Sequence, residues 1–149
     1  MADMTEDPVT YRLFNEIGII DQLAGAAFRQ VLPAPLNQSM FGVLNHFVRL
    51  GDGKTPTDLA RIFQVAKPSM TATLGKLERA GFVRIDPDAQ DGRTKRVFLT
   101  PQGREARAAA IAATQSLFDG LASDLADFDI PRLVEELGRL RAILDAARD

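Results

Sequence analysis

The segment between positions 55 and 81 constrains the fold more than any other part of the sequence. Thr55 is followed by Pro56 and Asp58. This order is typical of a helix start, because the threonine hydroxyl can cap the first turn and proline fits the first helical position. It predicts a short helix from Pro56 to about Phe63. The inner face of this helix comprises Leu59, Ala60 and Phe63.

A second helix is expected from Lys67 to about Ala80, after a turn formed by residues 64–66. Its apolar side chains recur at steps of four and three, so one face packs against a core. Gly81 suits the position just past a helix end. A short helix, a tight turn and a longer helix form the helix-turn-helix pattern. The inner face of the second helix comprises Met70, Leu74 and Leu77.

Two β-rich runs follow this pattern directly. Residues 82–85 and 96–99 predict two strands of equal length. The loop between them, residues 86–95, contains a proline, a glycine and a mixture of charges. A hairpin with a long polar tip that follows a helix-turn-helix is a wing. The expected fold is therefore mainly α (α+β), a winged helix-turn-helix.

Long helices are expected on both sides of this unit. An apolar stripe runs along residues 9–31, and the two prolines of residues 32–35 end it. Asn37 can cap the helix that precedes the short one. After Thr100-Pro101, an alanine-rich helix is expected to extend to about Leu125.

The last helix, from about Pro131 to Ala147, has apolar side chains at alternating steps of three and four. This is the seam of a coiled coil, which one helix on a thin domain cannot bury alone. We therefore expect a two-fold homodimer, the alternative being a helical layer inside a monomer. The expected interface comprises Leu13, Ile17, Ile20, Leu133, Leu137, Leu140 and Leu144.

Charge is distributed unevenly along the chain. The formal net charge of the protein is only -2. Residues 54–107, however, hold eleven basic and six acidic side chains, a local net charge of +5, and include all four lysines. A basic segment on an acidic body would orient the protein toward the dense negative charge of a DNA duplex. A solvated surface of mixed charge is the alternative.

Composition excludes several other classes. Cysteine is absent and His46 is the only histidine, so we expect no disulfide, no metal site and no cofactor. The sequence contains no phosphate-binding glycine loop and no nucleophile paired with a base, so it indicates no catalytic site. No apolar run approaches a membrane span, and the acidic N-terminus lacks a secretory pattern, so a cytoplasmic protein is expected.

Five runs of this sequence together indicate a family: Thr55-Pro56-Thr57-Asp58-Leu59-Ala60, Met70-Thr71, Leu77-Glu78-Arg79-Ala80-Gly81-Phe82-Val83, Asp91-Gly92-Arg93-Thr94-Lys95-Arg96 and Leu99-Thr100-Pro101-Gln102-Gly103. With these runs the chain resembles the MarR (multiple antibiotic resistance regulator) family of bacterial transcription factors. The resemblance implies three parts. Residues 1–35 would form an N-terminal dimerisation helix, residues 36–100 a winged helix-turn-helix DNA-binding domain, and residues 101–149 C-terminal dimerisation helices.

The resemblance implies that the second helix enters a major groove of double-stranded DNA and that the wing reaches a minor groove. Arg93 would be the minor-groove arginine, and Asp91 would pair with it to hold the turn. Two features weaken the recognition helix. Ala66 stands where a capping side chain is usual, and Gly75 lies on the exposed face. The expected DNA contacts are Lys67, Pro68, Ser69, Thr71, Ala72, Lys76, Asp91, Arg93, Lys95 and Arg96.

The resemblance also implies a function, which is that of a repressor that binds a near-palindromic operator as a homodimer. A small aromatic or anionic effector would release it from the DNA. Two alternatives remain open, a DNA-binding regulator without a ligand and a winged-helix module that binds protein. The expected effector contacts are Tyr11, Phe14, His46, Phe47, Arg49 and Phe118.

Overall fold

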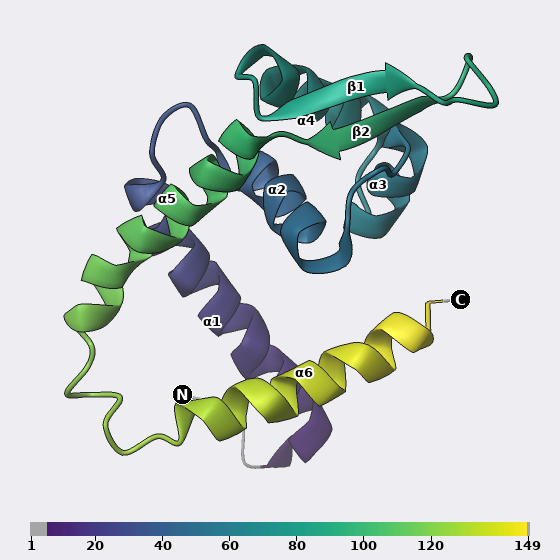
Figure 1. The fold of residues 1–149 in the computed structure, drawn as a ribbon. Coiled ribbons are helices and arrows are strands. Elements are labelled where there is room, and N and C mark those ends of the chain that lie inside the picture. Colours follow the sequence, from purple (N-terminus) through teal and green to yellow (C-terminus); the bar gives the residue numbers. More distant parts are fainter. Residues whose placement is uncertain (1–5, 149) are drawn as a thin grey trace. The chain divides into compact units, whose positions relative to one another are not determined.

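The computed structural model describes residues 6–148. In chain order the elements are α1 (Val9–Val31), α2 (Gln38–Leu50), α3 (Pro56–Phe63), α4 (Lys67–Arg79), β1 (Val83–Pro87), β2 (Lys95–Leu99), α5 (Pro101–Asp119) and α6 (Ile130–Ala146) (Figure 1). The chain divides into two compact units, residues 1–114 and 115–149. The predicted mainly helical fold with a two-stranded wing is confirmed.

Local capping explains where the helices begin. The Asn37 side chain accepts a hydrogen bond from the Met40 backbone N–H at 2.9 Å, and α2 starts at Gln38, directly after Asn37. The Thr55 hydroxyl accepts one from the Asp58 N–H at 3.1 Å, as the capping pattern predicts. A left-handed residue, Gln64, ends α3 and opens the tight turn to α4. Both helices of the helix-turn-helix therefore begin at the predicted residues.

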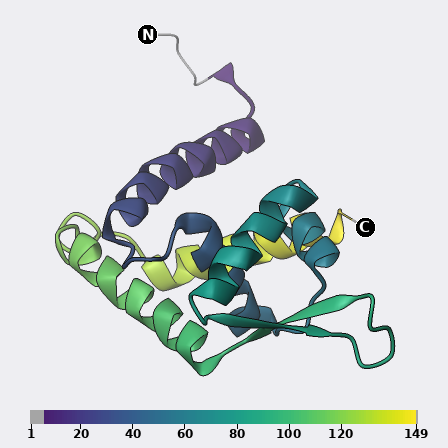
Figure 2. The same ribbon diagram turned by 90° about the horizontal axis from the view of Figure 1, so that it is seen from above.

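The wing is a two-stranded antiparallel hairpin whose tip projects beyond α3 and α4 (Figures 1 and 2). Its register pairs Val83 with Leu99 and Pro87 with Lys95. Phe82, predicted to start the first strand, instead donates its N–H to the Leu77 carbonyl at 2.9 Å. This bond closes the end of α4, where Gly81 has a φ of 77°, so β1 begins one residue later than predicted.

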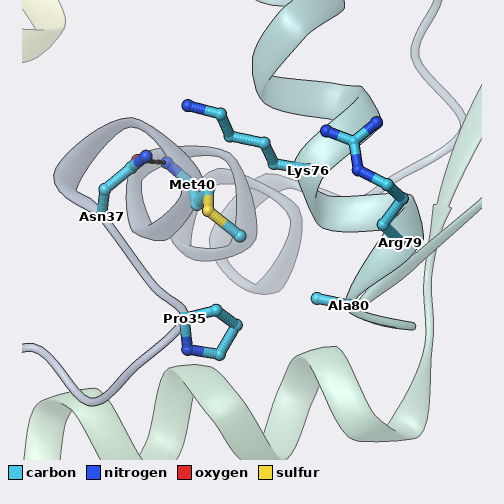
Figure 3. Close-up of a pocket in the computed structure, with 6 residues that line it drawn as sticks. All are labelled: Pro35, Asn37, Met40, Lys76, Arg79 and Ala80. Carbon is cyan, nitrogen blue, oxygen red and sulfur yellow. Dashed lines mark hydrogen bonds between the residues drawn. The ribbon is translucent and has the colours of Figure 1, made fainter.

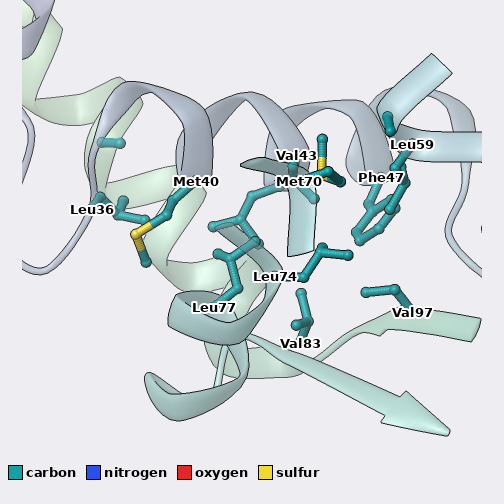
Figure 4. Close-up of a cluster of buried hydrophobic side chains, with 13 residues drawn as sticks. Leu36, Met40, Val43, Phe47, Leu59, Met70, Leu74, Leu77, Val83 and Val97 are labelled. Carbon is teal, nitrogen blue, oxygen red and sulfur yellow. The ribbon is translucent and has the colours of Figure 1, made fainter. Parts of the chain in front are cut away.

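The hydrophobic core joins α2, α3, α4 and the base of the wing (Figure 4). The predicted inner faces are confirmed by the burial of Leu59 on α3 and of Met70, Leu74 and Leu77 on α4. One connection was not predicted, an isolated bridge between Lys54 and Val97 that ties the segment before α3 to β2. The core comprises Leu36, Met40, Val43, Leu44, Phe47, Leu59, Ala60, Met70, Leu74, Leu77, Val83, Val97 and Ala110.

The start of α5 packs directly against the turn between α4 and β1. The Thr100 hydroxyl accepts the Gly103 N–H at 3.0 Å and donates to the Gly81 carbonyl oxygen at 2.6 Å. Gly103 lies so close to this turn that a Cβ atom there would stand 2.1 Å from the Phe82 carbonyl oxygen. The Leu-Thr-x-x-Gly run thus has a structural reason, since it joins α5 to the base of the wing.

The helices outside this core leave apolar side chains exposed. On α1, Leu13 and Ile20 are 43% and 60% exposed, while Ile17 is half-buried. On α6, no residue is buried. Of the predicted seam on α6, Leu140 is half-buried and the other three leucines are between 46% and 47% exposed.

The predicted extension of α5 to Leu125 is wrong. The helix ends at Asp119, and turns follow in which the Leu121 N–H bonds to the Phe118 carbonyl and the Leu125 N–H to the Leu121 carbonyl. Gly120 comes directly after the last helical residue, and glycine is a poor helix former.

Candidate DNA-binding surface

A basic hollow of about 370 Å³ lies where the helix-turn-helix meets the wing. It brings together four of the predicted DNA contacts, two from α4 and two from the wing. Its other walls come from the start of α3, and Thr94 contributes from the loop. The lining residues are Thr55, Pro56, Thr57, Lys67, Thr71, Arg93, Thr94 and Lys95. No acidic side chain lines it, so it suits a polyanion.

The start of α4 offers backbone donors beside this hollow. Ala66 makes no side-chain capping bond, as its residue type predicts. Uncapped first-turn amides can donate to phosphate oxygens or to base edges. Pro68, Ser69, Thr71 and Ala72 are all exposed on this helix. The predicted contacts are therefore accessible.

Two predicted contacts on α4 line other hollows. Ser69 faces a small one of about 130 Å³, which Gly42 and Phe63 also line. Lys76 faces a larger one that also borders α2. Both residues are accessible, but the structure does not gather them with Arg93 in the basic hollow.

Asp91 holds the tip of the wing, although not through the arginine side chain. Its carboxylate accepts the backbone N–H of Arg93 at 3.1 Å and the hydroxyl of Thr94 at 3.1 Å. Its carbonyl accepts the Thr94 N–H at 3.0 Å. The predicted pairing of Asp91 with the Arg93 side chain is therefore corrected to a backbone contact. The Arg93 guanidinium has no ion pair within the part of the chain that the structure describes, and it is free for a ligand.

Arg96 has a structural role that its predicted contact with the DNA backbone did not anticipate. Its guanidinium pairs with the Asp88 carboxylate and donates to the Gly53 carbonyl oxygen at 2.8 Å. These bonds tie the wing to the segment before α3, 43 residues away in the sequence. A side chain engaged in this way braces the wing, and the contact of Arg96 with the DNA backbone stays a prediction.

The same ion pair determines the titration of Asp88. The hydrogen bond from the Arg96 side chain, helped by those from the Gln90 and Asp91 amides, lowers the Asp88 pKa from 3.8 to about 2. Because the pKa of Asp88 is lower in the folded than in the unfolded protein, the ion pair stabilises the folded state fully above pH 4. This stabilisation is lost as the pH falls toward 2.

An NMR titration of the Asp88 side-chain carboxyl carbon should therefore give a midpoint near pH 2 in the folded protein. In Arg96→Ala the midpoint should move up toward the ordinary value, since the largest cause of the shift is gone. An unchanged Asp88 midpoint in Arg96→Ala would contradict the assigned role of Arg96.

Sequence reasoning missed residues that line the basic hollow and, outside the hollow, a cation–ring contact on the wing. Thr57 and Thr94 line the hollow, although no sequence signal marked them beyond their neighbours. Arg84 on β1 lies with its guanidinium carbon 5.1 Å from the Phe98 ring centre and bonds to Asp86 at 2.5 Å. The alternation of the strand could have placed Arg84 and Phe98 on one face, because they are cross-strand partners.

The predicted effector residues are distributed over both units. Tyr11, Phe14 and Arg49 are exposed in the first unit, whereas Phe118 is exposed in the second. Phe47 is only 3% exposed and belongs to the core, so it has no surface for a ligand and is removed from the set.

His46 is half-buried, and its ring meets the edges of two phenylalanines, Phe47 and Phe63. Burial, helped by Lys54 and Arg49, lowers the pKa of His46 below 6.5. Its Nε2 atom has no hydrogen-bond partner among the described residues. A neutral ring against aromatic edges is an ordinary packing role, and a contact to an effector remains a prediction.

The fold and the basic hollow together define a class of protein, the winged helix-turn-helix DNA-binding proteins. The wing, the recognition helix and their shared hollow are its essential parts. Within residues 6–148, no helix is long and apolar enough to cross a membrane.

Comparison with known proteins specifies the family. A model of the MarR family matches residues 35–94. The transcriptional activatory protein BadR from Rhodopseudomonas palustris is 30% identical over 119 residues, which cover 78% of this chain and 67% of the relative. The chain therefore belongs to the MarR family of transcriptional regulators, which are DNA-binding proteins and not enzymes.

Solved structures agree with this fold. The transcriptional regulator BldR from Sulfolobus solfataricus is similar with a TM-score of 0.68 and 26% identity, over 95% of this chain and 99% of that one. A mutant of MarR from E. coli is similar with a TM-score of 0.73 and 24% identity, over 86% of this chain and 95% of that one. A mutant of MepR from S. aureus, bound to an oligodeoxyribonucleotide, is similar with a TM-score of 0.58 and 22% identity. The match covers 93% of this chain and 99% of that one.

Proposed function

We propose that this protein is a homodimeric repressor whose wing arginine and recognition helix bind a near-palindromic operator. The observation that carries the proposal is the basic hollow, in which Lys67 and Thr71 of α4 meet Arg93 and Lys95 of the wing. An arginine at a wing tip suits a narrow, electronegative minor groove. Residues 36–100 would then be the DNA-binding domain, with residues 1–35 and 101–149 forming the dimer.

Dimerisation is supported by the exposed apolar faces of α1 and α6. Leu137 and Leu144 are each 47% exposed, and Ile20 is 60% exposed. Exposed apolar rows of this kind are buried when two helices pair. Two recognition helices related by a two-fold axis would match half-sites about one helical turn apart.

Release by a small ligand is the third part of the proposal. Tyr11 and Phe14 expose aromatic rings, and Arg49 exposes a guanidinium that suits an anionic partner. An effector that prefers the DNA-incompetent arrangement would weaken operator binding by its differential affinity, typically about 1–3 kcal/mol. Titration of the protein–operator complex with a panel of aromatic acids tests this part.

An activator is the second function to consider, because the relative from Rhodopseudomonas palustris is named a transcriptional activatory protein. Footprinting on the DNA that flanks the protein's own coding region would locate the operator. Transcription in vitro from the same fragment distinguishes the two, since a repressor lowers transcript yield and an activator raises it.

The variant Arg93→Ala should weaken binding to the mapped operator by about tenfold or more, because one groove contact is worth about 1–3 kcal/mol. Its melting temperature should stay close to that of the wild type, since the Arg93 guanidinium makes no ion pair within residues 6–148. Fluorescence anisotropy measures the affinity. Gln90→Ala, an exposed change in the same loop, is the control and should bind normally. Equal affinities for the two variants would refute the wing assignment.

A further inference from the structure

A second hollow, of about 540 Å³, lies between the start of α2 and the end of α4 (Figure 3). It belongs entirely to the first unit. Its volume is within the range of small-molecule sites. Three polar side chains and three apolar residues line it: Asn37, Lys76 and Arg79, and Pro35, Met40 and Ala80.

The two cations of this hollow have no anionic partner among the residues that the structure describes. Two arginines of the wing are neutralised, Arg84 by Asp86 and Arg96 by Asp88. Lys76 and Arg79, by contrast, make no ion pair or hydrogen bond within residues 6–148, and no carboxylate lines the hollow. Two unpaired cations on one helix face repel each other, so an anion between them would lower the electrostatic energy.

The absence of a side chain at Gly75 leaves room for the Arg79 guanidinium. A Cβ atom at Gly75 would lie 3.3 Å from Arg79 Nη1, which means that the guanidinium folds back over the glycine. In Figure 3, the Lys76 side chain extends from the same helix toward the start of α2. The glycine that weakens the recognition helix thus leaves room for a guanidinium.

Asn37 supplies a third donor. Its Oδ1 atom accepts the Met40 N–H at 2.9 Å, the bond drawn in Figure 3, and this orients the side-chain amide. The NH₂ group of the same amide makes no hydrogen bond within residues 6–148. Because it can only donate, it complements the two cations.

We propose that this hollow binds a phosphate group, held by the Arg79 fork, the Lys76 ammonium and the Asn37 amide. A guanidinium matches two phosphate oxygens, and an ammonium adds a point charge. The apolar residues Pro35 and Ala80 accommodate the carbon skeleton that carries the phosphate. Two sources share this chemistry, the backbone of bound DNA and a free phosphate ester. The DNA source rests on the proposed operator binding, whereas the free ester does not.

The DNA source is tested by the salt dependence of operator binding. Each duplex phosphate that a protein neutralises contributes about 0.9 to the slope of log affinity against log salt. The double variant with Lys76→Ala and Arg79→Ala should therefore lose about one unit of slope per subunit. Alanine favours helix at both positions. Arg104→Ala, which removes one positive charge at an exposed site outside the hollow, should leave the slope unchanged.

Binding of a free phosphate ester is tested on the protein without DNA. Inorganic phosphate is added at constant ionic strength, with chloride as the balancing anion, while NMR follows the Arg79 side-chain Nε–H signal. A saturable shift that Lys76→Ala abolishes supports a site for a free phosphate ester. The proposal is overturned if the double variant keeps the wild-type slope and the Arg79 signal also does not respond. A wild type that fails to bind any operator would refute the proposed function and leave the phosphate titration valid.

Discussion

Gly103→Ala should destabilise the protein by about 3 kcal/mol, the upper part of the usual range for an overpacked site. The added Cβ atom would lie 2.1 Å from the Phe82 carbonyl oxygen and 2.9 Å from Leu99 Cδ1. The carbonyl cannot move aside cheaply, because it accepts the Thr100 N–H at 3.1 Å. Relief of the clash therefore requires α5 to separate from the base of the wing.

Urea denaturation followed by circular dichroism measures this change. The control is Gly138→Ala, the same substitution within α6, where a Cβ atom would meet no heavy atom within 4 Å. That variant should be as stable as the wild type or gain up to about 1 kcal/mol, since alanine is the better helix former. If the two variants had equal stability, the close packing of α5 on the wing would be refuted.

Leu137→Glu should abolish the dimer and most of the operator affinity together. Leu137 is 47% exposed in the single chain, so a glutamate there leaves the monomer folded. In the proposed dimer the new carboxylate would be buried without a partner, which costs several kcal/mol. Each half-site would then be bound separately, and the avidity of linked sites, about 10²–10⁴-fold, would be lost.

Analytical ultracentrifugation and operator binding are measured on the same samples. Ala142→Glu adds the same charge to α6 on the side opposite the leucine seam, where Ala142 is exposed. This control should remain a dimer with normal affinity. A monomeric Leu137→Glu protein with full operator affinity would disprove the dimer model, while a dimeric one would show that the seam lies elsewhere.

The sequence was sufficient wherever one short-range interaction decides the structure. Thr55 and Asn37 cap helices through bonds to backbone amides three residues away. On β2, Val97 is buried and its neighbours Arg96 and Phe98 are half-buried, so the strand turns one side chain inward between two that point away from the core. Of the predicted DNA contacts, Lys67 and Arg93 meet in one hollow because the order helix, turn, helix and hairpin brings them there.

Tertiary structure alone decided what depends on contacts between distant segments. Arg96 and Arg93 look equivalent in the sequence, yet Arg96 is occupied by the Gly53 carbonyl, which local pattern cannot foresee. Phe47 and the exposed aromatic residues likewise differ only in whether other elements cover them.

The basic segment from Thr55 to Thr100 was thus identified as a winged helix-turn-helix by its own local signals. The sequence determined where the two helices of the helix-turn-helix begin, because capping, turn and periodicity act within a few residues. The tertiary structure decided which cations remain free to bind an anion. Freedom of this kind depends on which carboxylates and carbonyls the folded chain brings within hydrogen-bond distance.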